Sequence, residues 1–477
     1  MVDVLLIFPP ISVNERYAKN VGDVGGHLPP LGLLTIAAVL EENGYSVEVI
    51  DGPVSGLDTR GVAKLAKKKK PGIIGISFLT ASVYRAEELA KYLKKSMPDT
   101  PVIVGGHHTT ILPKEVAKNK HFDAGVMGEG EFTFLELIQK YKENPKLFKQ
   151  PDELLKIQGM VVKVKGKVKF SGTRPPISDL DALPFPARHL VDMKKYVPLP
   201  NQYLRKPITN MVAIRGCPYQ CTYCSNSAIF GRKIRFPSPE RTVSEMEHLI
   251  DDYGIREISF WDDTFTVNKE WLHKVCDLII KKKFDIIWSC YGRVNTVDLK
   301  LLRKMKKAGC WNIFYGLEAG DQKLLDIINK NITLQQIRNA IRWTKQAGIE
   351  SRGSFMLALP GETPELARKT IDFACELDLD YAQFCITTPF PGTKLYETAK
   401  KYGKLDKKFD EYHIWSPVFV PYGYKDKEEI EKMFKLAFRK FYMRPSYAWK
   451  QFRKIKTMED VRRNLKGLRL VLGMTES

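Results

Sequence analysis

Short apolar runs alternate with longer amphipathic stretches along the first 145 residues of the chain. A short apolar run bounded by turn residues is typical of a buried strand, and apolar residues three or four positions apart are typical of a helix. The predicted strands span residues 4–8, 47–51, 72–78, 102–104 and 123–127, and the predicted helices span 32–43, 60–69 and 83–97. This order predicts a doubly wound, Rossmann-like α/β domain over residues 1–145, with its ligand at the carboxyl ends of the strands.

The same alternation resumes between residues 206 and 395. Amphipathic helices such as 244–253 and 334–347 separate six predicted strands, at residues 211–215, 257–261, 286–291, 312–317, 354–359 and 383–387. Six β/α units fit a partial, open barrel better than a closed eight-stranded one, and active sites of such barrels lie at the carboxyl ends of the strands.

The segments on either side of this predicted barrel have other patterns. Residues 146–205 are predicted to be a connector with short basic β-type pieces and a proline-punctuated stretch at 178–186. Residues 396–477 lose the strand pattern and predict a helical, basic C-terminal domain, with a helix at 427–441 and two further helical stretches after Pro445. A chain of 477 residues is too long for one ordinary core, so two or three domains are expected.

The distribution of apolar residues also bears on location. No apolar run reaches eighteen residues, so no transmembrane helix is expected. The start of the chain has no basic residues before its first apolar run, which indicates a strand and not a signal peptide. A cytoplasmic location is therefore predicted.

The formal charge of +21 leaves several kinds of binding partner open. Nucleic acid, an anionic membrane surface and anionic cofactors would all suit a basic protein, and so would a lysine-rich solvated surface without a specific partner. Residues 435–477 hold twelve Lys or Arg against three Asp or Glu. Their basic and aromatic helices favour either peripheral contact with a membrane and a hydrophobic substrate, or a packed cap over the barrel.

Three cysteines, Cys217, Cys221 and Cys224, follow the first barrel strand at C-x3-C-x2-C spacing. An iron–sulfur cubane normally takes four thiolates, so three leave one iron open. The alternative is a structural zinc site of three cysteines and a histidine, but no histidine lies close in sequence. The other five cysteines are scattered and are expected to be buried apolar residues: Cys276, Cys290, Cys310, Cys375 and Cys385.

Small and polar residues follow the strands of the N-terminal domain. They occupy positions 51–52, 77–80, 105–110 and 128–131, and several are glycines. Glycine lets a backbone approach a bulky ligand closely. Four such strand ends on one sheet edge favour a nucleotide-like cofactor.

The blocks at residues 29–33, 105–110 and 128–131 resemble the cobalamin-binding domain of the B12-binding radical SAM superfamily over the N-terminal third, and the stretch at 178–186 resembles that family's interdomain link. The resemblance implies a cobalamin cofactor contacted by Ser77, Thr80, Gly105, Gly106, His108, Gly128, Glu129 and Gly130. The Asp-x-His-x-x-Gly motif of B12 mutases is absent. His108 is therefore expected to bond backbone or contact corrin side chains, and not to ligate cobalt; the lower base of cobalamin would be displaced without a histidine replacement.

The cysteine motif, with Tyr223 before its last cysteine, resembles the radical S-adenosylmethionine (SAM) signature. The resemblance implies that Cys217, Cys221 and Cys224 each bind one iron of a 4Fe-4S cluster. The fourth iron would bind SAM, whose cleavage gives a 5′-deoxyadenosyl radical. Tyr223 is expected against the adenine.

Further residues are expected around this pocket. The stretch 316–320 matches the family's Gly-x-Glu-x-Gly element, so Glu318 is expected to bond the ribose or amino group of SAM. Arg293 and Arg352 are expected either to pair with the methionine carboxylate or to be ordinary surface ion-pair partners. Residues 262–265 match another family block, with a role in substrate contact or in loop structure.

Together these features predict a cobalamin-dependent radical SAM enzyme that modifies an unactivated carbon. Methyl transfer to a small-molecule or lipid substrate is the leading interpretation; the alternative is non-methylating cyclisation, oxidation or carbon–carbon coupling on a lipid or tetrapyrrole. The electron would come from a reductant such as flavodoxin or ferredoxin, under anaerobic conditions.

Two other classes are disfavoured. An RNA methylthiotransferase would need a second, N-terminal cysteine cluster, and no cysteine precedes Cys217, so nucleic acid is not the expected partner. A B12 sensor without catalytic activity would not need the three-cysteine loop.

Overall fold

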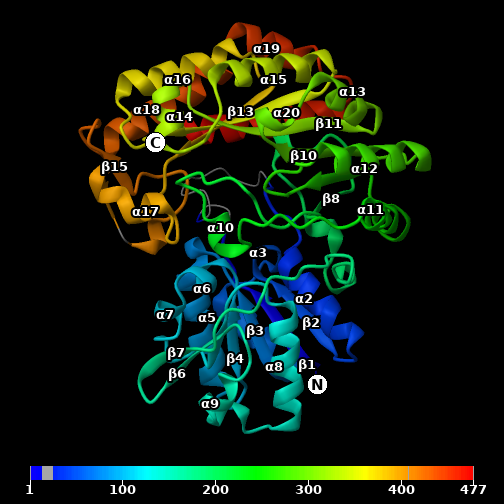
Figure 1. Ribbon diagram of the computed structural model, residues 1–477, viewed down its shortest axis with the longest axis vertical. Helices are drawn as coiled ribbons and strands as arrows, with labels where there is room; N and C mark the ends of the chain where they lie inside the picture. The colour runs from blue at the N-terminus through cyan, green and yellow to red at the C-terminus, as the bar shows by residue number, and fades with distance from the viewer. Residues whose placement is uncertain (1, 13–14, 16–24, 407, 476–477) are drawn as a thin grey trace.

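The computed structural model describes residues 2–12, 15, 25–406 and 408–475. Two α/β units lie one above the other along the long axis of the molecule, with the N-terminal unit at one end and the later helices at the other (Figure 1).

A doubly wound sheet forms the N-terminal unit, as the sequence predicts. Its parallel strands are β1 (Val2–Phe8), β2 (Val47–Asp51), β3 (Pro71–Ser77), β4 (Val102–Gly105) and β5 (Ala124–Val126), in the order β2-β1-β3-β4-β5. Helices α2 (Leu31–Glu42) and α8 (Glu131–Glu143) pack on one face, and α4 (Thr59–Lys69) and α5 (Val83–Ser96) pack on the other. Helices on both faces explain the near-continuous apolar strands. The strand order reverses at β1 and β3, where such sheets bind ligands.

The sheet does not end at residue 145. Strands β6 (Met160–Val164) and β7 (Lys167–Phe170) form an antiparallel hairpin that pairs with β5 and brings the sheet to seven strands. Lys165 and Gly166 both have positive φ at the turn, as a tight hairpin requires. Met160, Val162 and Val164 join the core beneath α8. The start of the expected connector thus belongs to the first unit.

Six parallel strands form an open barrel in the second unit, in chain order. They are β8 (Ile208–Met211), β9 (Glu257–Phe260), β10 (Ile287–Gly292), β11 (Cys310–Glu318), β12 (Glu350–Leu357) and β13 (Tyr381–Ile386). The outer face carries α11 (Pro239–Tyr253), α12 (Lys269–Lys282), α13 (Leu299–Lys307), α15 (Leu334–Gln346) and α16 (Pro364–Glu376).

The first of these strands ends earlier than the sequence predicts. It was expected over residues 211–215, but β8 ends at Met211. The carboxylate Oδ1 of Asp262 accepts hydrogen bonds from the backbone N–H of Ala213, at 2.8 Å, and of Ile214. A side chain therefore replaces the neighbouring strand as the acceptor, and the chain leaves the sheet before the cysteines.

The C-terminal region is mainly helical, with α18 (Lys427–Tyr442), α19 (Pro445–Phe452) and α20 (Met458–Thr475). Helix α18 covers the edge strand β13, where Phe438 and Phe441 contact Phe384. Two short antiparallel strands, β14 (Gly403–Leu405) and β15 (Phe419–Pro421), correct the expectation that strands stop at residue 396. Among the described helices, none combines the length and the apolar character needed to cross a bilayer.

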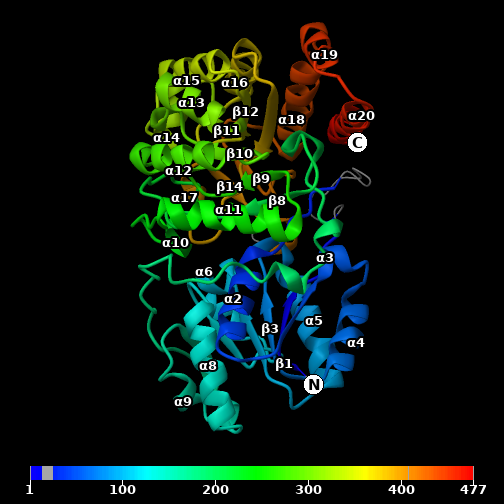
Figure 2. The same cartoon turned by 90° about the vertical axis from the view of Figure 1, so that its right-hand side faces the viewer.

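The carboxyl ends of the two sheets face each other. Figure 2 shows α6 (His107–Ile111), which follows β4, directly opposite α10 (Asn226–Ile229), which follows the cysteine loop. The connector fastens both units: Tyr196 donates to Asp51 at the end of β2, at 2.9 Å, and the fully buried Arg188 donates to Glu245 on α11, at 3.0 Å. The loops that carry the candidate residues therefore meet at one interface.

Candidate active site

The three cysteines lie together in the loop after β8. This loop starts at Gly216, whose φ is +90° and where a Cβ would lie 2.5 Å from the Lys233 carbonyl oxygen, so only glycine fits. Cys217, Cys221 and Cys224 all line one cavity of about 420 Å³, and none forms a disulfide. Burial raises the pKa of the Cys217 thiol, so a metal that binds its thiolate must displace a proton.

Three polar side chains meet on another wall of this cavity. The Tyr223 hydroxyl donates to Glu318 Oε1 at 2.9 Å, and Lys330 Nζ lies 2.5 Å from the same oxygen and 3.0 Å from the hydroxyl. Glu318 has a φ of +63° at an irregularity in β11, a conformation rare for a residue with a side chain. Such backbone strain clusters at functional sites.

Sequence reasoning missed Lys330. It lies in a loop between two helices, and its only local signal is that Asn329 and Asn331 on either side suit left-handed turns. Its side chain is only 6% exposed, and its ammonium group compensates the carboxylate of Glu318, whose side chain is equally buried.

Arg293 also lines the cavity. Its Nη1 lies 3.6 Å from Cys221 Sγ, its Nη2 donates to the Lys330 carbonyl, and its guanidinium carbon lies 3.6 Å from the Tyr219 ring centre. It is 5% exposed, so the expectation of a surface ion pair is wrong for this residue.

Arg352 does not reach this cavity, which corrects its expected place beside Arg293. Strand β12 begins at Glu350, earlier than predicted, so Arg352 lies inside the barrel below Ser354, which does line the cavity. Its guanidinium carbon is 4.0 Å from the Phe314 ring centre, and Nη1 donates to the Asn201 carbonyl at 3.2 Å. It is 5% exposed, so it is not a surface residue either.

Residues 262–265 have two separate roles. Asp262 is buried and accepts hydrogen bonds from two backbone N–H groups just beyond β8, so its role is in loop structure. Asp263 and Thr264 line the cavity, with Thr264 Oγ1 3.9 Å from Cys217 Sγ. Among the described residues no histidine lines this cavity, and no group of three His, Cys, Asp or Glu side chains is arranged around a single metal position.

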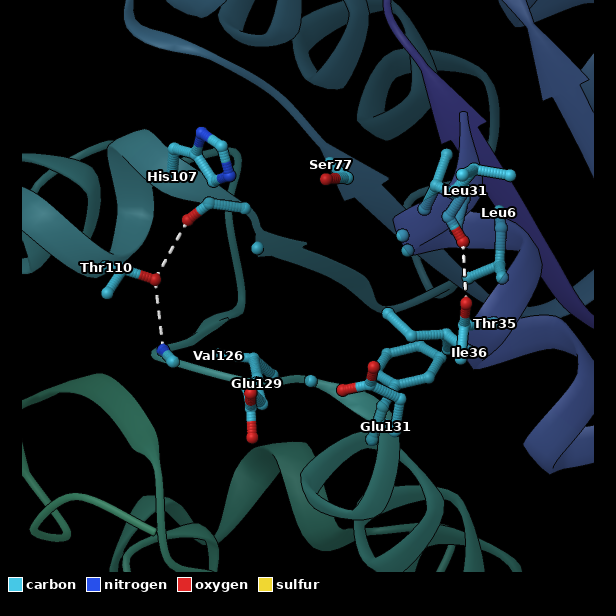
Figure 3. A pocket seen from close by; sticks show the side chains of 18 of the residues that line it. Leu6, Leu31, Thr35, Ile36, Ser77, His107, Thr110, Val126, Glu129 and Glu131 are labelled. Atoms are coloured by element: carbon cyan, nitrogen blue, oxygen red, sulfur yellow. Dashed lines mark hydrogen bonds between the residues drawn. The ribbon is translucent and has the colours of Figure 1, made fainter. Parts of the chain in front are cut away.

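A second cavity, of about 280 Å³, opens at the carboxyl ends of the N-terminal strands (Figure 3). Its lining includes the predicted residues Ser77, Gly105, Gly106, Gly128, Glu129 and Gly130. A Cβ on Gly105 would meet nothing closer than 3.8 Å, and one on Gly128 nothing within 4 Å, so these glycines leave space for a ligand. Thr110 Oγ1 donates to the Gly106 carbonyl and accepts from the Gly128 N–H, both at 3.0 Å, which ties the two glycine loops together.

His108 lies outside this cavity, which corrects its expected contact with a cofactor. It is 2% exposed, with Nδ1 3.1 Å from Thr80 Oγ1 and its ring against Phe78 and Phe409. Burial lowers its pKa to about 4, so the ring is neutral at pH 7. His107, which the sequence analysis missed, lines the cavity instead, because successive helical residues point about 100° apart.

A third cavity, of about 720 Å³, lies between the two units and is here called the chamber. Thr80 and His107 line it from the N-terminal unit, and Trp261, Tyr291 and Phe314 line it from the barrel. His107 also lines the N-terminal cavity, and Tyr291 and Phe314 also line the cysteine cavity. Asn210 Oδ1 is buried at the chamber wall without a hydrogen-bond partner among the described residues. Both sites thus adjoin one shared space.

Four buried charges join the units beside these cavities. Glu129 accepts from Arg235 at 2.8 Å and lies 3.3 Å from Arg215, which donates to Glu131 at 2.6 Å. Glu129 also accepts from the Ile177 N–H at 2.6 Å, so its carboxylate serves the interface although the residue lines the N-terminal cavity. Burial by itself would raise the pKa of Glu129, but the Arg235 hydrogen bond and the Arg215 charge lower it.

Comparisons with known proteins agree with this two-part site. The family model described as the radical SAM superfamily matches residues 211–374, and the one described as the B12 binding domain matches residues 18–138. An uncharacterized methyltransferase of Pyrococcus horikoshii is 37% identical over 447 residues, which cover 93% of this chain and 93% of that protein. An anaerobic magnesium-protoporphyrin IX monomethyl ester cyclase of Rubrivivax gelatinosus is 28% identical over 461 residues, covering 94% and 79%.

The solved structures show the same fold. The radical SAM methyltransferase TsrM of Kitasatospora setae, with cobalamin and a 4Fe-4S cluster bound, matches with a TM-score of 0.71 at 16% identity. The match covers 94% of this chain and 90% of that one.

The Arg215→Met variant tests the interface charges. It leaves Glu131 buried without its cation, so we expect the two units to dock less stably by about 3–5 kcal/mol. Hydrogen exchange at the facing loops and the thermal unfolding midpoint measure this loss. Pairing lowers the pKa of Glu129 below its ordinary value of 4.5. The contribution of Glu129 to the stability of the interface is therefore complete at pH values above 4.5, and it is lost as the pH falls below 4.5 through the lowered pKa.

Two controls accompany this variant. Arg338→Met removes an exposed pair with Glu376, 41% and 54% exposed, and should cost no more than about 1 kcal/mol. The double variant Arg215→Met/Glu131→Gln should recover part of the loss. Equal losses in the single and double variants would show that the charge pair does not hold the units together.

Proposed function

The chain belongs to the family of cobalamin-dependent radical SAM enzymes, and from this premise we propose that it transfers a methyl group to an unactivated carbon. The observation that carries the proposal is the chamber of about 720 Å³, which adjoins the cysteine cavity on one side and the glycine-lined cavity on the other. A substrate in the chamber would lie between two cofactors. The relative from Pyrococcus horikoshii that bears the name methyltransferase supports methyl transfer.

The cysteine cavity has the donors that a 4Fe-4S cluster and SAM require. Thiolates are the usual ligands of iron–sulfur clusters, and we propose Cys217, Cys221 and Cys224 as the three ligands. When bound, this pair supplies a radical that can remove hydrogen from an unactivated carbon. Glu318 would accept hydrogen bonds from the amino or ribose groups of SAM, Tyr223 would lie against its adenine, and Lys330 would hold Glu318 in place.

The glycine-lined cavity suits cobalamin. Gly105 and Gly128 leave open space where side chains would stand. At the chamber wall, Asn210 Oδ1, which has no hydrogen-bond partner in the part of the chain that the structure describes, would accept from the amide side chains of a corrin ring that extends into the chamber. When bound, cobalamin supplies the methyl group. We propose Ser77, Gly105, Gly106, Gly128 and Gly130 as its contacts, with His107 at the border between cavity and chamber.

The protein's own residues exclude water and orient the substrate. The barrel side of the chamber is lined by aromatic side chains: Trp261, Tyr291, Phe314, Phe390, Tyr412 and Trp415. An apolar wall of this kind keeps solvent away from a reactive carbon radical. It also favours a substrate with a large apolar part.

The alternative is non-methylating chemistry such as ring closure, oxidation or carbon–carbon coupling. The relative from Rubrivivax gelatinosus, a cyclase by name, favours it, because its similarity also extends over 94% of this chain. Both reactions would begin with the same hydrogen abstraction, so the cysteine cavity serves either.

The Cys221→Ala variant tests the cluster site. We expect the reconstituted variant to lose SAM cleavage under anaerobic reduction, because three thiolates are needed to hold the cluster. Cys375→Ala is the matched control: this cysteine is half-buried against α18, far in sequence from the loop, and its loss should leave cleavage unchanged. Cleavage that persists in Cys221→Ala would contradict the assignment.

The Gly105→Phe variant tests the cobalamin site. A phenyl ring at this position would project into the cavity, so we expect protein purified with hydroxocobalamin to lose the visible spectrum of the bound cofactor. Gly105→Ala should keep it, since a Cβ there meets only ordinary contacts. An unchanged spectrum for Gly105→Phe, or no bound cofactor in the unaltered protein, would contradict the proposed site.

Mass spectrometry distinguishes methyl transfer from the alternative. Extracts of cells with and without the gene should differ by a compound heavier by one or more CH2 units. A product of unchanged carbon count that has lost hydrogen would favour ring closure or oxidation and would overturn methyl transfer.

A further inference from the structure

A fourth cavity, of about 330 Å³, lies under the C-terminal helices and takes no part in the proposed function so far. Its walls come from strand β13, from helices α18, α19 and α20, and from residues 199–201 of the connector. Most of the lining side chains are apolar or aromatic, among them Phe438, Tyr442, Tyr447, Ile455, Leu470 and Met474. Figure 2 shows α18, α19 and α20 together along one edge of the barrel, where α18 packs beside α16.

This cavity adjoins the chamber. Leu199, Gln383 and Trp415 line both spaces. Gln383, on β13, also lines the cysteine cavity, so a single side chain borders all three. The cavities therefore form a series that leads from the C-terminal helices to the cysteine loop, with aromatic walls for much of its length.

The outer end of this series is an exposed apolar surface. Met443, Phe452 and Leu468 line the cavity and are 49%, 64% and 53% exposed. The same helices and the short link between them expose further large apolar side chains: Trp449, Met458, Leu465 and Leu472. A patch of this kind at the mouth of a cavity marks an interaction site.

Exposed basic residues lie close to these apolar residues in the sequence. Arg453, Arg462, Lys466 and Arg469 are exposed and form no ion pair with any described residue. On α20, Leu465, Leu468 and Leu472 are spaced three and four residues apart, so they share one face of the helix, and the cations lie between them in sequence. Apolar side chains bordered by unpaired cations are typical of helices that lie on an anionic membrane surface.

We propose that the C-terminal helices rest on an anionic membrane surface and that the cavity beneath them takes up the hydrocarbon chain of an anionic membrane lipid, which is the substrate. The hydrocarbon chain of the lipid would pass Gln383, so that one of its carbon atoms would lie in the chamber. That the lipid is the substrate rests on the proposed function; that it binds in the cavity does not. The exposed large apolar residues distinguish this surface from one that binds nucleic acid through cations alone.

Vesicle binding tests the surface. The full-length, cofactor-reconstituted protein should sediment with phosphatidylglycerol vesicles and much less with phosphatidylcholine vesicles. Phe452→Glu/Leu468→Glu should weaken this binding at least ten-fold, whereas Ile327→Glu, which alters another exposed apolar residue in the helix Gln322–Ile327, should leave it unchanged. Equal binding to both vesicle types, or binding to a single-stranded RNA and not to vesicles, overturns the proposal.

The cavity is tested with pyrene-labelled phosphatidylglycerol. A Cβ on Gly467 would meet only Pro200, at 3.9 Å, so Gly467→Ala should bind the probe as the unaltered protein does. With the probe supplied as a monomer in the absence of vesicles, Gly467→Phe fills the space and should abolish energy transfer from protein tryptophan to pyrene. In separate assays, vesicle binding and SAM cleavage should persist. Unchanged transfer in Gly467→Phe overturns the cavity assignment. Loss of SAM cleavage in the unaltered protein, with probe binding intact, would contradict the proposed function alone.

Discussion

A buried charge without a partner is among the most costly defects a fold can contain. Two carboxylates and two guanidinium groups avoid this cost by pairing across the interface. The carboxylates are those of Glu129 and Glu131, which follow β5, and the guanidinium groups are those of Arg215 and Arg235, at the base of the cysteine loop. Arg215 and Arg235 also pair through their backbones, by bonds of 3.1 and 2.9 Å, and so close the loop that holds the three cysteines. One cluster therefore shapes this loop and sets its position against the glycine-lined cavity.

A similar constraint operates inside the barrel. Lys330 and Arg293 bring two more cations into the cysteine cavity, and each is held by groups that the fold already provides: Lys330 by Glu318 and Tyr223, Arg293 by the Lys330 carbonyl and the Tyr219 ring. Because these groups are fixed before any ligand arrives, little reorganisation is needed when a charged cofactor binds. The left-handed backbone of Glu318 is consistent with this, since the surrounding contacts must maintain it.

The sequence predicted the two sheets well, because parallel strands buried on both faces are near-continuous apolar runs. The errors have local physical causes. The apolar run around Ala213 leaves the sheet because Asp262 binds its N–H groups, and the hairpin 160–170 joins the first sheet only through pairing with β5. Residues predicted from motifs, such as Cys217 and Gly105, line the cavities at the expected strand ends. The sequence does not show which of two neighbouring helical residues faces a cavity, so His108 was predicted in place of His107. Lys330 lines the cysteine cavity from a turn that contains no recognisable motif.

The basic residues behind the net charge of +21 differ in whether they have acidic partners. Many barrel cations have acidic partners, as in Lys282 with Glu247 and Arg338 with Glu376, so they contribute little field at a distance. The exposed cations of α20 have none among the described residues, and they stand beside apolar side chains at the mouth of a cavity. A substrate has to reach the chamber between the two docked units. Since buried ion pairs hold the interface together, an entrance under the C-terminal helices spares the two units from separating at each turnover.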